Sequence, residues 1–160
     1  MSDTRRKLAS FVHHLGEEVD WRFDLNDFYD RIRMQKYVKL AEAFGFDHPY
    51  EYGLYIHGPY SPSLANDYYS DPFKRWHKGD PPELTDFDAE AFGELVNDKD
   101  HGWLEVAATI KFLDDSLGRS NGPTMESVLD RMTELKNVSR PAAREIYLTL
   151  EESGVLSRRG

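Results

Sequence analysis

The sequence predicts a mainly α-helical fold with a minor β-element, a small β-hairpin, and a C-terminal segment of helix-turn-helix type. Two observations lead to this prediction. Apolar residues recur at helical spacing along most of the chain, whereas the apolar–polar alternation of a strand is confined to Tyr50–His57. With 160 residues, 39% of them hydrophobic, the chain is long enough for one sizeable core. We therefore expect a single domain over residues 1–160.

Composition narrows the range of functions. The absence of cysteine excludes disulfides, thiolate zinc sites and cysteine nucleophiles. Acidic residues outnumber basic ones by 29 to 20, and this net charge of −9 repels phosphate backbones. Aspartate exceeds glutamate and arginine exceeds lysine, which is typical of halophilic surfaces, although an ordinary acidic surface has the same character. No apolar run approaches the ~18 residues of a membrane helix, so we expect a soluble, cytoplasmic protein without membrane contact.

The first half of the chain predicts two helices. The first is amphipathic, and the linker after it carries aromatic residues that we expect to fill the core. Asn26 or Asp27 can cap the second helix, which extends to Phe44 and ends at Gly45 in a left-handed cap. The apolar residues are Leu8, Phe11, Val12 and Leu15 in the first helix, Trp21, Phe23 and Leu25 in the linker, and Ile32, Met34, Tyr37, Val38, Leu40 and Ala41 in the second helix.

The stretch YEYGLYIHGPYSPSLANDYY, from Tyr50 to Tyr69, holds six of the nine tyrosines. Its alternation predicts a strand whose core-facing residues include Ile56. Gly58-Pro59 should end the strand as a turn, with Gly58 in a conformation that is costly for other residues, and Tyr60 should lie just outside the ladder. Ser61 is a good N-cap with Pro62 following, which predicts a short helix. The other core-facing residues of the strand are Tyr50, Tyr52 and Leu54.

The remainder of the chain predicts one long loop and four more helices. Breakers such as Pro81-Pro82 predict the loop over Ser70–Thr85. A helix should start at Asp86 or Asp88, and another should cover His101–Leu117. Caps and helical spacing then predict a helix–turn–helix pair: Thr124 starts one helix, Ser139 with Pro141 starts the next, and Gly154 ends it.

No pattern in the chain marks catalytic chemistry. Phosphate-loop, dinucleotide and nucleophile-elbow motifs are absent, and no acid or serine is tied to His57 by spacing. His13 and Glu17 share a helix face, but two such residues do not make a metal site. We therefore assign no catalytic, cofactor-binding or metal-binding residue, and an enzyme of unknown type is only the third hypothesis.

Two kinds of partner are considered instead. A protein partner is indicated by the number of tyrosines in the central stretch, because tyrosine is enriched at interfaces. Its candidate contact residues are Tyr55, His57, Tyr60, Arg75 and Trp76. The alternative is a DNA-binding regulator with a winged-helix-like end, helped by the basic residues of Lys74–Lys78. Its candidate contact residues are Arg140, Arg144, Arg158 and Arg159.

The segment RIRMQKYVKLAEAFGF, followed by the tyrosine-rich stretch, resembles the YwgA-like proteins and, more distantly, the SocA-like Panacea antitoxin domains. Those families have a helix of the form LQKLVYLLQ and then an aromatic strand ending in GPYS or GPV. Here Met34-Gln35-Lys36-Tyr37-Val38 and Gly58-Pro59-Tyr60-Ser61 occupy the matching places, and the likeness covers about Asp30 to Asp71. The resemblance implies a mostly helical domain with a small β-element. The YwgA-like group has no established activity, whereas the Panacea group implies neutralisation of a partner protein or a role in defence.

From these observations we expect a non-enzymatic interaction or regulatory protein without a cofactor. The DNA-binding regulator is the first alternative.

Overall fold

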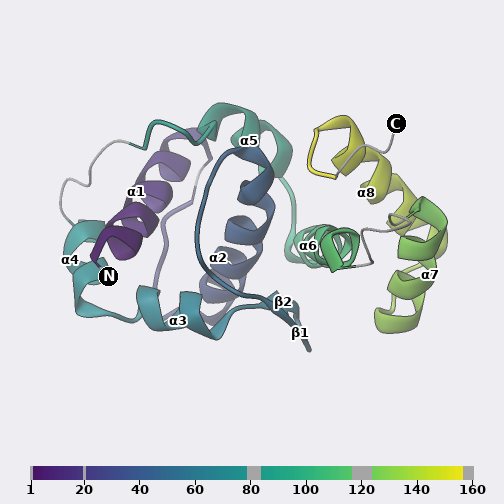
Figure 1. Cartoon of the computed structure of the whole chain (residues 1–160), viewed down its shortest axis with the longest axis horizontal. Helices are drawn as coiled ribbons and strands as arrows, with labels where there is room; N and C mark the ends of the chain where they lie inside the picture. Colours follow the sequence, from purple (N-terminus) through teal and green to yellow (C-terminus); the bar gives the residue numbers. More distant parts are fainter. Residues whose placement is uncertain (1, 20, 79–83, 117–123, 157–160) are drawn as a thin grey trace.

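The structure, a computed structural model, describes residues 2–19, 21–78, 84–116 and 124–156 (Figure 1). It confirms the predicted fold class, since helices dominate and a two-stranded antiparallel sheet is the only sheet in the described residues. The elements are α1 (Ser2–Glu18), α2 (Phe28–Ala41), the 3₁₀ helix η1 (Glu42–Phe44), β1 (Gly53–Tyr55), β2 (Gly58–Tyr60), α3 (Pro62–Tyr68), α4 (Asp71–Lys78), α5 (Ala89–Val96), α6 (His101–Ser116), α7 (Met125–Leu135) and α8 (Arg140–Glu152).

Helix α6 links the two sides of the molecule. On one side it packs against α2 and β2, and on the other against α7 and α8, which also pack against each other (Figure 1). Helix α1 lies farther out, against α4 and α5. The hairpin β1–β2 is therefore attached to the central helices α2 and α6 rather than to the outer ones.

The helix starts follow the predicted caps. Asp27 accepts a hydrogen bond from the Tyr29 amide at 2.9 Å, and Ser61 Oγ accepts one from the Leu64 amide at 3.3 Å. Asp88, Thr124 and Ser139 cap α5, α7 and α8 in the same way. Each capping side chain accepts a hydrogen bond from a backbone amide that has no partner within its helix. The N-terminal ends of these helices are therefore determined by the local sequence.

Aromatic rings fill the centre between α1, α2 and α5. Phe11 stacks on Phe46 with ring centroids 4.4 Å apart and meets Phe87 at 5.0 Å. Trp21 meets Tyr37 edge-on at 5.0 Å, and Phe23 is buried as well. The linker aromatics therefore serve the core, as predicted.

The predicted loop over Ser70–Thr85 is wrong in its first half, where α4 forms. Ser70 Oγ accepts a hydrogen bond from the Phe73 amide at 3.3 Å, and Pro72 lies in the first turn, where its missing N–H costs nothing. Phe73 is only 1% exposed, so burial of its ring stabilises the helix. The breakers Gly79 and Pro81-Pro82 lie outside the described residues.

The predicted course of the hairpin is also corrected. Strand β1 is three residues long, Ile56 and His57 make the turn, and Gly58-Pro59-Tyr60 forms the second strand instead of a turn. Tyr60 thus lies in the ladder, paired with Gly53. Ile56, which was predicted to face the core, is 86% exposed because it belongs to the turn.

Candidate interaction surface

A single side chain of α2 holds the chain where β2 runs into α3. Gln35 is fully buried, and its Oε1 accepts a hydrogen bond from the Ser61 amide at 2.8 Å. Its Nε2 donates to Ser61 O at 3.1 Å and to the Tyr68 hydroxyl at 3.4 Å. Ser61 is also fully buried, so the Gln35 side chain satisfies the Ser61 amide as a neighbouring strand would. Its bond to the Ser61 carbonyl adds to the one from the Ala65 amide at 3.1 Å.

Lys36, the next residue of α2, supports the strand itself. Its Nζ donates to Pro59 O at 3.0 Å, and the residue is only 1% exposed. Burial lowers the pKa of Lys36 to about 8, while the carboxylate of Glu105 opposes this shift and the charge of Lys136 adds to it. The two sequence motifs that carry the family resemblance, around Gln35-Lys36 and Gly58–Ser61, are therefore in direct contact.

Because the pKa of Lys36 is lowered, we expect the protein to become more stable as the pH rises above about 8. Between pH 8 and 10.5 the unfolded chain binds a proton that the folded protein has released, so the free energy of unfolding increases with pH. We expect a gain of about 2 kcal/mol between pH 8 and ~9.5 in urea titrations. Above pH ~10 the trend reverses, because burial raises the pKa values of Tyr50, Tyr52 and Tyr68.

The matched control for this experiment is Lys36→Met, which keeps an unbranched side chain but cannot titrate. Its stability should be flat over the interval in which the wild type gains. A flat wild-type profile would contradict the lowered pKa of Lys36.

The turn of the hairpin is held from the C-terminal side of the molecule. Lys136, which follows α7, donates from Nζ to Ile56 O at 2.9 Å and pairs with Glu105 Oε2 at 2.9 Å. The hairpin thus has a fixed base on α2 and α6 and a second support beside α7. Its tip faces outward, where Ile56 is 86% exposed.

Apolar side chains gather at this tip. Phe28 and Tyr29, at the start of α2, are 45% and 60% exposed, and Tyr55 and Ile56 are 54% and 86% exposed. The ring of Phe28 meets those of His57 and Tyr29 at 5.5 Å each, which joins the start of α2 to the turn. We call these five residues, Phe28, Tyr29, Tyr55, Ile56 and His57, the hairpin-tip patch.

The hairpin-tip patch includes some of the predicted partner residues. Tyr55 and His57 belong to it, whereas Tyr60 is half-buried beneath Tyr55, with ring centroids 5.6 Å apart. Arg75 is exposed on α4, which lies far from the hairpin (Figure 1). The side chain of Trp76 lies outside the described residues.

Three members of the patch were not predicted. Phe28 and Tyr29 directly follow the Asp27 cap, and side chains of a first helical turn often extend beyond the body of the protein. Their position at the start of a helix was the signal in the sequence from which their exposure could have been predicted. Ile56 could be found only by locating the turn.

Charged side chains of both signs lie near His101, at one end of the patch. Tyr29 meets the ring of His101 at 5.1 Å, and Arg33 Nη2 donates to His101 Nε2 at 3.4 Å. Burial and the charge of Arg33 lower the pKa of His101, against the opposing effect of Asp100, Asp30 and Asp27. Three acidic side chains therefore act on His101 against Arg33, and a second arginine, Arg31, lies over the Phe28 ring at 5.9 Å.

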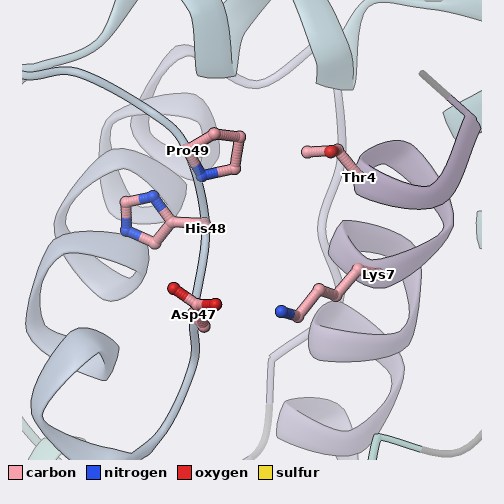
Figure 2. Close-up of a pocket in the computed structure, with 5 residues that line it drawn as sticks. All are labelled: Thr4, Lys7, Asp47, His48 and Pro49. Atoms are coloured by element: carbon pink, nitrogen blue, oxygen red, sulfur yellow. The ribbon is translucent and has the colours of Figure 1, made fainter.

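A cavity of about 490 Å³ lies between α1 and the segment after η1 (Figure 2). Lys7 points across it toward Asp47, while the ring of His48 turns away from Lys7. His48 Nδ1 accepts from the Tyr50 amide at 3.0 Å, and its Nε2 donates to Glu42 at 2.9 Å. Both ring nitrogens are engaged, so His48 offers neither a base nor a metal ligand to the cavity.

Charged groups near this cavity neutralise one another. Lys39 Nζ lies 3.2 Å from Glu42 and 3.1 Å from Asp115, and Lys111 Nζ pairs with Asp115 at 2.9 Å. Burial opposes the ionisation of Glu42, but the hydrogen bond from His48 and the charges of both lysines lower its pKa. Within the described residues no group of three His, Asp or Glu side chains could hold a metal ion.

Two of the four predicted DNA-contact residues, Arg140 and Arg144, belong to the described residues, and both lie on α8. Arg140 donates to Glu126 at 2.5 Å and to Asp130 at 2.6 Å, both on α7. Arg144 is exposed on α8, and Arg158 and Arg159 lie outside the described residues. DNA binding through this segment stays a prediction, with one of its arginines engaged by two carboxylates.

Comparison of the chain with protein-family models, with curated proteins and with solved structures finds no match. The resemblance to the YwgA-like and Panacea groups therefore also stays a prediction. Within the described residues, every helix is too short or too polar to span a lipid bilayer.

Proposed function

We propose that this protein is a non-enzymatic interaction module that binds a partner protein through the hairpin-tip patch and regulates it. One observation carries the proposal. Of the five large hydrophobic side chains that are exposed in the described residues, four lie in this patch, and only Tyr69 lies elsewhere. A concentration of exposed apolar groups on one surface is typical of protein–protein contacts. Neutralisation of the partner, as in antitoxins, is the form of regulation that the sequence resemblance favours.

The rigid base of the hairpin supports this role. Gln35 and Lys36 fix β2 and the following residue from inside, and Lys136 fixes the turn. A surface that is ordered before binding loses less conformational entropy when the partner arrives. Tyrosine and phenylalanine add rigid apolar area, and the tyrosine hydroxyl adds a hydrogen-bonding group.

The double substitution Tyr29→Ser and Ile56→Ser tests the proposal. Both side chains are more than half exposed, so the melting temperature should change by less than about 3 °C. Binding of a partner that is purified with the wild-type chain from its host should weaken at least about 30-fold, because central apolar contacts dominate such interfaces. Calorimetry with the purified partner measures both affinities.

Tyr69→Ser is the matched control. Tyr69 is 50% exposed but follows α3, outside the patch, so its loss should leave the affinity unchanged. Equal affinity of the wild type and the double variant would show that the partner binds another surface.

A further inference from the structure

The two edges of the hairpin differ in their hydrogen bonding. The inner edge, on β2 and the residue after it, is closed by side chains of α2: Lys36 binds Pro59 O, and Gln35 binds the amide and carbonyl of Ser61. These residues replace a third strand on that side. The outer edge belongs to β1.

Pro59 fixes which groups of β1 face outward. In an antiparallel ladder, pairs that exchange two hydrogen bonds alternate with pairs that exchange none. Leu54 faces Pro59, which has no N–H, so this pair exchanges none, and the bonded pairs are Gly53 with Tyr60 and Tyr55 with Gly58. The N–H and C=O of Leu54 therefore point away from β2. The bond from Lys36 to Pro59 O supports this assignment of bonded and non-bonded pairs, because it shows that the carbonyl of Pro59 also points out of the ladder.

The edge of β1 is open within the part of the chain that the structure describes. Strand β1 packs mainly against β2, which itself lies on α2 and α6, and Figure 1 shows β1 on the side of the hairpin away from α6. In this part no hydrogen bond reaches the amide or carbonyl of Leu54. The exposed side chains of Tyr55 and Ile56 follow directly. An open strand edge beside apolar side chains is the arrangement used for strand addition.

Charge distinguishes between the possible occupants. A second copy of this chain would bring another net charge of −9, which opposes pairing of two identical edges. At the end of the patch near His101, the three carboxylates Asp27, Asp30 and Asp100 outnumber the two arginines Arg31 and Arg33. A partner segment with basic side chains beside apolar ones complements both features.

We propose that an extended, basic segment of the partner protein adds to the open edge of β1 as a third, antiparallel strand. One residue of that segment exchanges two hydrogen bonds with Leu54, and its neighbours contact Tyr55 and Ile56. Two backbone bonds alone give little affinity, so the apolar contacts of the hairpin-tip patch are needed as well. The inference rests on the proposed function and specifies how the partner is held.

The probe is a displayed library of random 12-residue peptides, selected on the whole chain. Peptides that lose binding to the Tyr29→Ser, Ile56→Ser variant are synthesised, and their affinities are measured by calorimetry. Leu54→Pro removes an amide that the ladder does not use and also replaces the leucine side chain, and proline is tolerated at such edge positions. It should weaken binding about tenfold, whereas Leu54→Ala, which keeps the amide, should stay within about threefold.

Amide exchange of the wild type gives a test that needs no variant. In the free protein the Leu54 amide should exchange faster than those of Tyr55 and Tyr60, and saturation with the selected peptide should protect it. Unchanged exchange of Leu54, or equal binding by Leu54→Pro, overturns strand addition, while the proposed function stands if the partner still needs Tyr29 and Ile56. Failure to select any peptide that needs the patch also overturns it. A wild-type dimer that Leu54→Pro dissociates would assign the edge to a second copy.

Discussion

Replacing Gly58 with valine should lower the free energy of unfolding by about 3 kcal/mol and the melting temperature by roughly 10 °C. Gly58 has φ of 92°, in the left-handed region that β-branched residues avoid. An added Cβ would also lie 3.1 Å from Thr109 Oγ1, 3.3 Å from Glu105 Cγ and 3.4 Å from Lys36 Cε. Strain and crowding therefore add at one position, on the side of the hairpin that faces α6.

Gly154→Val separates these two causes. Gly154 has φ of 82°, but no heavy atom lies within 4 Å of its added Cβ. Strain alone should cost about 1–2 kcal/mol there. Thermal unfolding of both variants gives the difference that is due to crowding. If Gly58→Val has the same melting temperature as the wild type, the attachment of the hairpin contributes little to stability.

Gln35→Leu should destabilise the protein by about 3 kcal/mol in urea unfolding. The substitution conserves much of the side-chain volume, so the loss comes from hydrogen bonding. It leaves the amide of Ser61 without its partner, and Ser61 is fully buried. It also removes the bond from Gln35 to the Ser61 carbonyl, which keeps only the bond from the Ala65 amide at 3.1 Å. Each buried polar group without a partner costs about 1–3 kcal/mol.

Tyr68→Phe provides the comparison within the same network. It removes only the hydroxyl that accepts from Gln35 at 3.4 Å, a long bond, and should cost less than about 1 kcal/mol. A Gln35→Leu variant no less stable than Tyr68→Phe would mean that the backbone of Ser61 finds other partners.

Much of the helical architecture could be predicted from the sequence because its signals are local. Asp27, Ser61, Thr124 and Ser139 each cap the helix that follows them, and a cap needs only its own side chain and the next turn. Helical spacing likewise identified buried residues of α1, α2, α6 and α7.

The hairpin could not be predicted in detail because its course depends on distant groups. Alternation from Tyr50 to His57 fits a longer strand as well as a three-residue strand with a turn. The choice between them depends on Gln35, Lys36 and Lys136, which contact the hairpin from two helical regions. Polar residues such as Gln35 and Lys36 do not stand out as buried in a pattern of apolar spacing, and only the family resemblance drew attention to them.

The distances along the chain between the hairpin and its supports determine when it can form. Strands of three residues are too short to be stable alone. Gln35 reaches Ser61 over 26 residues, and Lys136 reaches Ile56 over 80 residues. During synthesis the hairpin therefore gains its last support only after α7 has left the ribosome. A partner that requires the finished hairpin will therefore not bind nascent chains. It will bind only molecules whose C-terminal helices are already in place.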